Sequence, residues 1–443
     1  METQEGRSVV QETNYADWRR QRGWEPLLVV RGEGSRFWDS TGKEFLDLSS
    51  QLVARNLGHS NPAVVQAIQR QAGRLPYAAP GFSTEAREEL SRRLGEVLPD
   101  GLRRYFFSTS GTEANEAALK IARVVTGRRK VIARPRSYHG STAGSISVSG
   151  DVRRRATGPE SQVPGTLWAP DCYCYRCPLQ LKYPDCGVAC ADQVEDQLRE
   201  EPDVAAMIVE PVVGTNGVLV PVPEYLPRIR EITRRHGVLL IADEVMTGWG
   251  RTGRWFGVDH WGVEPDILTT AKGITSGYVP LGLTATTSSL HEAFQDRFFP
   301  HGHTYEAHPL ALAAASAVID EYRRLDLIEK SRRDGEYLLR RLRELSARHP
   351  SVGEVRGLGL FAAIELVADA GRRTPFNSEE DLLTGRPLVI HEVVSALRRE
   401  GVYVLGWIGH LIIAPPLIIS REELDRGIEA LDRALAVSDS RVA

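Results

Sequence analysis

The segment spanning residues 237–273 constrains the fold of this chain more than any other. Its first part is a short apolar run that closes on Asp243 and Glu244, and such a run predicts a strand buried on both faces of a parallel sheet. A second short apolar run leads to Lys272 in a glycine-containing turn. Ligands of open α/β sheets bind at the carboxyl ends of the strands. The segment therefore suggests a carboxylate paired with a cationic ring, and an amine nucleophile beside it.

The bulk composition is that of an ordinary globular enzyme. The 443 residues are 42% hydrophobic and 26% charged, with a net charge of −3. This balance gives no indication of nucleic acid or of an anionic membrane surface as a partner. No apolar run approaches the roughly 20 residues of a membrane-spanning helix, and the N-terminus lacks the apolar core of a signal peptide. We therefore expect a cytoplasmic protein without membrane or nucleic acid partners.

Short strands alternate with helices between residues 104 and 290, which is the pattern of an α/β fold. Residues 327–443 differ: helices at both ends of this region flank several short strands, among them one predicted at 402–405. The length allows one large α/β domain with a smaller domain attached.

A strand over residues 104–110 runs into Ser110, Gly111 and Thr112, and a helix follows. Strand, glycine-containing turn and helix together form an anion-binding arrangement, because free backbone N–H groups and the helix dipole face the anion. The same three residues also suit an ordinary helix N-cap, and the sequence leaves both interpretations open.

Two further strand-end loops carry candidate ligand-binding residues. Tyr138, in the Ser-Tyr-His-Gly stretch, has a ring that suits a flat ligand, although a packed loop tyrosine is an equal alternative. Residues 204–210 predict another buried strand that ends on a carboxylate, Glu210.

All five cysteines fall in one irregular segment, 172–190. Their spacing is compatible with a reduced structural insertion, a structural metal site or local disulfides. None of these interpretations makes the segment catalytic. The cysteines are Cys172, Cys174, Cys177, Cys186 and Cys190.

Taken together, the motifs resemble those of the class III pyridoxal-phosphate aminotransferases, and they occur in the family's order. The resemblance covers about residues 37–423. It rests on Ser110-Gly-Thr-Glu-Ala-Asn-Glu-Ala-Ala-Leu-Lys, Tyr138-His-Gly, Glu210-Pro, Asp243-Glu-Val, Gly250-Arg-Thr-Gly, Ala271-Lys-Gly and His303-Thr-Tyr.

The resemblance implies the transferase fold type I, in which a large domain holds a mainly parallel seven-stranded sheet and a small α+β domain follows. For this chain it implies a large cofactor-binding domain over residues 61–325 and a small C-terminal domain over 326–443. The N-terminal segment, 1–60, would pack with the small domain. Active sites in the family lie at a homodimer interface, and a tetramer is also open.

The resemblance further implies that the cofactor is pyridoxal 5′-phosphate and that no metal is needed. Lys272 would form a Schiff base with the cofactor and then act as the general base that moves the substrate proton. Asp243 would pair with the pyridinium nitrogen, so that the ring acts as an electron sink. Val245 and Tyr138 would lie on the two ring faces. The implied cofactor-binding residues are Ser110, Gly111, Thr112, Tyr138, His139, Glu210, Asp243, Val245, Lys272 and, reaching the other subunit's phosphate, Thr304.

Departures from sub-family patterns bear on the substrate. Members that use ornithine or γ-aminobutyrate carry a glutamate at the position of Thr215 and usually a glutamine at that of Met246. The segment 243–257 looks more like the ω-amino acid, taurine or amine:pyruvate members. The cysteine-containing insertion is similar to that of taurine-type members in particular.

Amine:pyruvate members often have a mobile arginine where this chain has Leu405. A carboxylate or sulfonate must then be met by another group, for which we consider Arg356, His410, Trp407 or backbone N–H groups. An interdomain salt bridge is an equal alternative for Arg356. The loops that line the family's substrate pocket carry residues for which ordinary loop packing is the alternative: Leu52, Val53, Tyr77 and Phe82.

The sequence thus predicts a homodimeric, cofactor-dependent transaminase with ping-pong kinetics. The amino donor is expected to be an ω-amino acid, a taurine-like compound or a primary amine. The acceptor is a 2-oxo acid, with pyruvate ahead of 2-oxoglutarate. The alternatives are another class III activity (2-oxoglutarate-linked transfer, aminomutation or decarboxylation) and a cofactor-binding protein without enzymatic activity.

Overall fold

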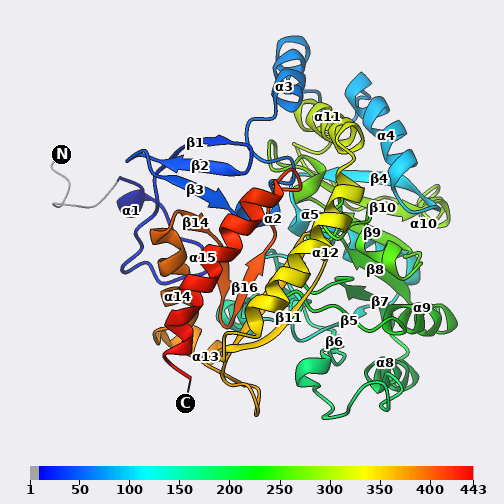
Figure 1. The fold of residues 1–443 in the computed structure, drawn as a ribbon. Coiled ribbons are helices and arrows are strands. Elements are labelled where there is room, and N and C mark those ends of the chain that lie inside the picture. Colours follow the sequence, from blue (N-terminus) through cyan, green and yellow to red (C-terminus); the bar gives the residue numbers. More distant parts are fainter. Residues whose placement is uncertain (1–8, 443) are drawn as a thin grey trace.

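The computed structural model describes residues 9–442, and its centre is a seven-stranded sheet (Figure 1). The strand order is β4-β10-β9-β8-β7-β5-β6. Strand β10 is antiparallel to both of its neighbours, and the other pairs are parallel. This mainly parallel sheet confirms the predicted fold class. The strands are β4 (Leu102–Ser108), β5 (Lys130–Ala133), β6 (Thr166–Trp168), β7 (Val204–Val209), β8 (Leu239–Asp243), β9 (Ile267–Thr270) and β10 (Gly282–Thr287).

The central strands are short and apolar because helices and loops cover both faces of the sheet. Every residue of β7 and of β9 is buried. In the parallel pair β8–β9, Asp243 lies opposite Thr269, so both strands end at the same edge of the sheet. Lys272 follows β9 directly, which brings the two residues of the segment 237–273 to one edge, as its pattern predicts.

Helix α5 packs against β4, β7, β8, β9 and β10. Ser110 is its N-cap residue, and the Ser110 side chain accepts a hydrogen bond from Glu113 N. Gly127 is its C-cap residue and is in the left-handed region with φ 67°. Helices α3 and α4 pack on α11, which contacts the turn that carries Lys272. The helices of this part are α3 (Pro62–Arg74), α4 (Glu85–Val97), α5 (Gly111–Thr126), α8 (Ala189–Glu200), α9 (Tyr225–Arg235) and α11 (Pro309–Arg324).

The two ends of the chain share a second, four-stranded sheet. Its order is β1-β2-β3-β14, and β14 pairs in parallel with β3, with Leu46 opposite Val402. Figure 1 shows this N-terminal sheet, in blue, beside the orange and red helices α14 and α15. Its strands are β1 (Val29–Glu33), β2 (Arg36–Asp39), β3 (Glu44–Asp47) and β14 (Val402–Tyr403).

The C-terminal part forms a third sheet of order β11-β12-β16-β15, with β13 paired to β12. The predicted strand over 402–405 is divided, because β14 ends at Tyr403 in the second sheet and β15 begins at Leu405 in the third. The elements are α12 (Leu327–Ser346), β11 (Val352–Leu358), β12 (Phe361–Asp369), β13 (Thr374–Pro375), α13 (Glu379–Thr384), α14 (Val389–Arg399), β15 (Leu405–Trp407), β16 (His410–Ile413) and α15 (Arg421–Asp439).

Short helices complete the described chain: α1 (Val9–Thr13), α2 (Ser50–Val53), α6 (Ala143–Ser147), α7 (Val152–Thr157) and α10 (Ser288–Glu292), with 3-10 turns at Pro159–Ser161, Cys174–Arg176, Gly257–His260 and Lys272–Ile274. Among residues 9–442, none of the helices has the length and apolarity that crossing a bilayer would need.

The cysteine segment lies between β6 and α8, and all five cysteines are free thiols. They line one cavity of about 20 Å³, which is about the size of a single water molecule. The described residues contain no group of three or more histidine, cysteine, aspartate or glutamate side chains placed to hold a metal ion. The free thiols give no support to local disulfides.

Candidate active site

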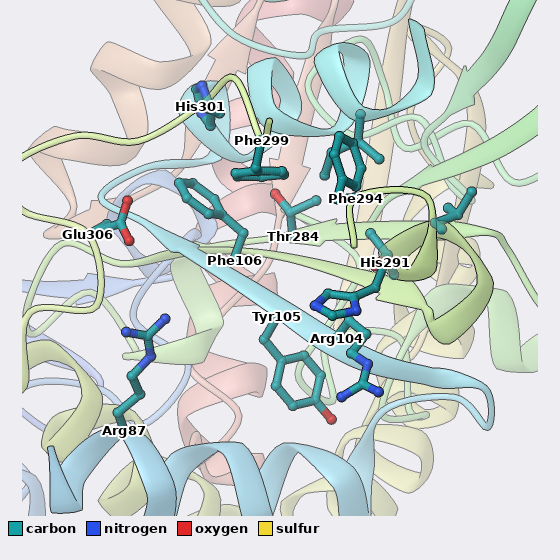
Figure 2. A pocket seen from close by; sticks show the side chains of 13 residues that line it. Arg87, Arg104, Tyr105, Phe106, Thr284, His291, Phe294, Phe299, His301 and Glu306 are labelled. Carbon is teal, nitrogen blue, oxygen red and sulfur yellow. The ribbon is translucent and has the colours of Figure 1, made fainter. Parts of the chain in front are cut away.

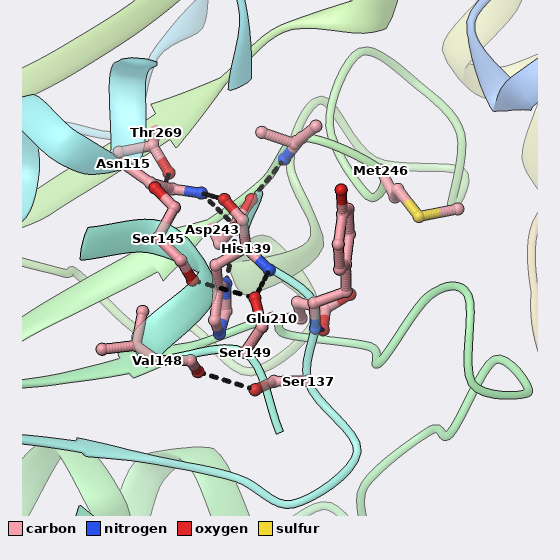
Figure 3. Close-up of polar contacts among 12 residues, drawn as sticks. Asn115, Ser137, His139, Ser145, Val148, Ser149, Glu210, Asp243, Met246 and Thr269 are labelled. Atoms are coloured by element: carbon pink, nitrogen blue, oxygen red, sulfur yellow. Dashed lines mark hydrogen bonds and ion pairs between the residues drawn. The ribbon is translucent and has the colours of Figure 1, made fainter. Parts of the chain in front are cut away.

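The candidate site lies at the carboxyl ends of β8 and β9, where the buried carboxylate of Asp243 is held by three donors. Its Oδ2 lies 2.7 Å from His139 Nδ1 and accepts a hydrogen bond from Asn115 Nδ2 at 2.8 Å. Its Oδ1 accepts one from Val245 N at 3.0 Å. Figure 3 shows Asn115 and His139 converging on Asp243 from different segments. The carboxylate is therefore fixed in orientation before any ligand binds.

Asn115 is a residue to which the sequence analysis assigned no role. Besides Asp243, its Nδ2 also donates to the carbonyl oxygen of His139 at 2.7 Å, and its Oδ1 accepts from Thr269 Oγ1 at 2.6 Å. It links the three chain segments that meet around the carboxylate. The sequence could have indicated Asn115, because it stands three residues after Thr112. This spacing places both side chains on one face of the helix.

Lys272 supplies the amine of the site. Its backbone is in the left-handed region with φ 45°, a conformation that costs energy for a non-glycine residue and is frequent at functional sites. Burial lowers the pKa of the amine to about 8, against the opposing effect of the negative charges of Asp243 and Glu210. No side chain or backbone group of residues 9–442 forms a hydrogen bond with its Nζ. The lowered pKa increases the neutral fraction of the amine near neutral pH, and the neutral amine is the nucleophile.

Glu210 is buried behind the Tyr138 loop and holds two backbone groups. Its Oε1 accepts a hydrogen bond from Tyr138 N at 3.0 Å, and its Oε2 accepts one from Gly214 N at 2.8 Å. Burial raises the pKa of Glu210, and the nearby charge of Asp243 acts in the same direction. Its contacts fit a residue that supports a neighbouring loop.

The start of α5 provides a cradle beside Val245. A Cβ atom built on Gly111 would lie 2.9 Å from a methyl group of Val245, closer than real Cβ contacts, so only glycine fits. Thr112 Oγ1 accepts hydrogen bonds from Ser141 N at 3.1 Å and Thr142 N at 3.2 Å. Ser110 caps the helix, as the alternative interpretation predicted, without excluding an anion at the same helix end.

Arg153, on α7, is a second residue without a predicted role. Its guanidinium lies 4.2 Å from the ring centroid of Tyr138 and 4.1 Å from that of Trp407, with Trp18 at 5.5 Å. One nitrogen donates to Asp151 at 3.0 Å, and Nη2 has no hydrogen-bond partner in the described part of the chain. Arg153 also lowers the pKa of Lys272, so its charge acts at the amine.

Two other residues predicted to line the substrate pocket, Trp407 and Arg356, have different surroundings. Trp407 lies against Arg153 and donates to Asn216 Oδ1 at 3.0 Å. The Arg356 guanidinium donates to the carbonyl oxygen of Gly217 and to Glu365, both at 2.6 Å. The ion pair with Glu365 lies within residues 326–443, and only the hydrogen bond to Gly217 reaches the preceding part of the chain. Arg153, in contrast, lies against Tyr138.

The loop that carries Thr304 lies apart from these contacts. Tyr77 donates to the carbonyl oxygen of Thr304 at 3.1 Å, and Phe82 is 68% exposed. Leu52 is exposed as well, whereas Val53 is buried. Val53 packs in a buried apolar cluster to which Met246 and Leu405 also belong.

A cavity of about 350 Å³ lies beside the edge strand β4 (Figure 2). Its walls include Phe106, Phe299 and His301, and none of the predicted site residues lines it. This cavity is therefore not the candidate site, because the chemically suited groups lie at the ends of β8 and β9.

The residues present fit pyridoxal 5′-phosphate. A fixed, buried carboxylate at Asp243 suits a cationic ring nitrogen, and the unpaired amine of Lys272 suits the aldehyde. The N-terminus of α5 and the hydroxyl of Thr112 suit a phosphate. The missing side chain at Gly111 lets Val245 pack closely against the start of α5.

Comparison with known proteins agrees with this chemistry. A family model described as aminotransferase class-III matches residues 19–435. An adenosylmethionine-8-amino-7-oxononanoate aminotransferase of Nitratidesulfovibrio vulgaris is 37% identical, covering 96% of this chain and 79% of the relative. A leucine/methionine racemase of Thermococcus litoralis is 34% identical over 95% and 93%. A taurine–pyruvate aminotransferase of Bilophila wadsworthia is 35% identical over 95% and 94%.

Solved structures give the same result. An (S)-enantioselective ω-transaminase of Thermomicrobium roseum superposes with a TM-score of 0.87 at 38% identity, covering 93% of each chain. A taurine:2-oxoglutarate aminotransferase of Bifidobacterium kashiwanohense, in complex with pyridoxal phosphate and glutamate, superposes with a TM-score of 0.91 at 34% identity and 98% coverage of each chain. With this fold, this site and these relatives, the chain belongs to the class III aminotransferases, enzymes that use pyridoxal 5′-phosphate.

Proposed function

We propose that this enzyme transfers the amino group of a donor that carries an anionic end, an ω-amino acid or a taurine-like sulfonate, to pyruvate. Simple primary amines are a second donor class. The observation that carries the proposal is the Arg153 guanidinium, which lies on the Tyr138 ring with Nη2 unpaired. Arginine binds carboxylates and sulfonates through its planar fork, so a donor held there would present its amine toward Lys272.

When bound, pyridoxal 5′-phosphate supplies an electron sink for the carbon that loses its proton. Lys272 would take up that proton and return it at the next position, as a general base and then a general acid. An amine with a pKa of about 8 suits this work near neutral pH, because proton transfer is most efficient when the pKa lies close to the working pH.

Asp243 would hold the proton of the cofactor's ring nitrogen, and His139 and Asn115 would keep its carboxylate in place. Val245 and Tyr138 would contact the two faces of the ring. Gly111 and Thr112, with Ser110 beside them, would bind the phosphate through backbone N–H groups and the hydroxyl. Glu210 would orient the Tyr138 loop through the Tyr138 N–H.

The proposal of pyruvate as acceptor rests on the threonine, Thr215, that lies next to Met246. Thr215 Oγ1 lies 3.6 Å from Met246 Sδ, in place of the glutamate found in members that use glutamate. Pyruvate carries a carboxylate of its own, which the same arginine would receive in the second half-reaction. The taurine–pyruvate relative supports this choice, and the taurine:2-oxoglutarate structure keeps 2-oxoglutarate as the next candidate.

We propose further that the active form is a homodimer in which Thr304 reaches the phosphate in the other subunit. In the single chain, several apolar side chains of this region are exposed: Tyr77, Phe82, Phe298 and Tyr305. The rings of Tyr77 and Tyr305 lie 6.3 Å apart, and exposed apolar surface of this kind supports a protein–protein contact. The division into a large domain, 61–325, and a small domain, 326–443, is proposed on the same family grounds.

A racemase is the second candidate function, because a leucine/methionine racemase is among the similar proteins. Lys272 would then return the proton to the carbon from which it came, and no amino group would leave. Decarboxylation, aminomutation and cofactor binding without catalysis have no comparable support.

The decisive experiment incubates the purified holoenzyme with taurine, β-alanine, γ-aminobutyrate or phenylethylamine, each with pyruvate or 2-oxoglutarate. We expect alanine to form from pyruvate, fastest with the anionic donors. Racemisation of leucine or methionine without an oxo acid, in the absence of alanine formation, would identify the second function instead.

A further inference from the structure

A cavity of about 550 Å³ lies on the outer side of Arg153 and Trp407, and we call it the outer cavity. It is bounded by the N-terminal residues 18–20, by helix α7 and by the chain between α13 and α14. Its volume is within the range of ligand pockets, roughly 300–1,000 Å³. Because Arg153 lines this cavity and also contacts Tyr138, the cavity adjoins the proposed donor site.

The wall of the outer cavity is apolar. Aliphatic side chains from α7 and from the segment around α13 contribute most of it: Val152, Ala156, Leu382, Leu383, Pro387 and Leu388. Apolar walls favour methylene chains, and each methylene group that leaves water raises affinity about three- to fourfold.

The rim of the outer cavity is cationic. Arg19 is exposed, and Arg20 donates to the carbonyl oxygen of Leu383 at 3.2 Å. Arg386 lies 3.2 Å from Asp381, so that pair is neutral overall. The charge of Arg19 contributes to lowering the pKa of His391, so the two side chains lie close together. Arg19 and Arg20 are the guanidinium groups that the rim offers to an anion.

We propose that the outer cavity binds the chain of long ω-amino acids, whose carboxylate extends past Arg153 and is received by Arg19 and Arg20. Short donors would end at Arg153, and long donors would end at the rim. This inference deepens the proposed function and rests on it, since it assumes that the amine reacts at Lys272.

The test measures kcat/KM with pyruvate for β-alanine and γ-aminobutyrate as short donors and for ω-aminooctanoate and ω-aminododecanoate as long donors. The variant Ala156→Trp fills the cavity from an exposed position on α7. We expect it to lower kcat/KM for the long donors by about tenfold or more and to leave the short donors within about twofold. The double variant Arg19→Ser/Arg20→Ser should also lower kcat/KM for the long donors only. The loss should be larger at low salt than at high salt.

Arg340→Ser removes an exposed arginine of α12 and is the matched control. It should change kcat/KM for neither the short nor the long donors. Arg153→Gln should give the opposite result to Ala156→Trp, with the larger loss for the short donors. Equal losses for short and long donors, or no measurable turnover of the long donors by the unmodified enzyme, would overturn the inference while leaving the proposed function standing. Failure of every donor to yield alanine would instead remove the proposed function itself.

Discussion

His139 Nδ1 lies 2.7 Å from Asp243 Oδ2, and both side chains are buried. A carboxylate has about four lone-pair positions, of which three are taken here by His139, Asn115 and the Val245 N–H. One position remains for a further donor such as a protonated ring nitrogen. The second nitrogen of His139 is buried without a hydrogen-bond partner in the described chain, so the imidazole has no competing contact.

The first prediction concerns this pair. Asp243→Asn keeps the shape but removes the charge that would hold a ring proton, so we expect kcat to fall about a thousandfold while the protein still folds and binds the cofactor. His139→Asn leaves Asp243 charged and should cost about tenfold. Steady-state kinetics with absorbance spectra of the cofactor separate the effects, and equal losses in the two variants would contradict the assigned roles.

The second prediction follows from the lowered pKa of Lys272. Between pH 8 and the ordinary pKa of 10.5, the folded cofactor-free protein binds fewer protons than the unfolded chain, so its free energy of unfolding rises with pH across this window. Lys272→Met removes the buried amine and should stabilise the cofactor-free protein at pH 7 by about 1–3 kcal/mol. Urea unfolding at pH 7 and pH 10 should show this difference shrinking, and a constant difference would refute a lowered pKa.

The third prediction tests the cradle at the start of α5. Gly111→Ala adds a methyl group 2.9 Å from Val245, which should push the two segments apart and weaken cofactor binding about tenfold. Val245→Ala removes the clash but also a proposed contact with the ring, so Gly111→Ala should cost less affinity in a Val245→Ala background than in the unmodified chain. Titration of the cofactor-free proteins, followed by absorbance, gives the affinities. If Gly111→Ala costs the same in both backgrounds, the contact is not the cause.

The fourth prediction separates the two arginines. Arg153→Gln should lower kcat/KM for anionic donors about a hundredfold and for a neutral amine such as phenylethylamine by much less, because only the anionic donors lose a charged partner. Arg153→Lys keeps the charge without the planar fork and should recover part of the loss. Arg356→Gln is the control: it leaves Glu365 buried with one donor fewer, so we expect a lower melting temperature with unchanged donor preference.

The segment 237–273 was informative because a short, fully apolar strand is stable only when both of its faces are buried, as in the centre of a parallel sheet. Its pattern placed Asp243 and Lys272 at one sheet edge, which the structure confirms. It could not distinguish Asp243 from Glu244. Side chains alternate along a strand, and Glu244 turns instead toward the N–H groups of Gly257 and Val258, at 2.8 Å each.

Arg153 and Trp18 could not be predicted in the same way. Trp18 belongs to the N-terminal segment and Trp407 to β15, and both meet Arg153 only through the tertiary fold. The local sequence around Arg153 is that of an exposed, charged helix end, yet its side chain is 9% exposed. Contacts between residues so far apart in the chain leave no trace in local periodicity. The assignment of individual cofactor and substrate residues therefore stays a prediction.

The parallel pairing of β3 with β14 has a consequence for how the chain is made. The edge of β3 that receives β14 is synthesised long before Val402 and Tyr403 leave the ribosome. Until then the N-terminal hairpin has an unpaired strand edge, which is a template for pairing with other chains. Slow translation of the second half would prolong this interval, so co-expression with a chaperone that covers the edge should raise the yield of native protein.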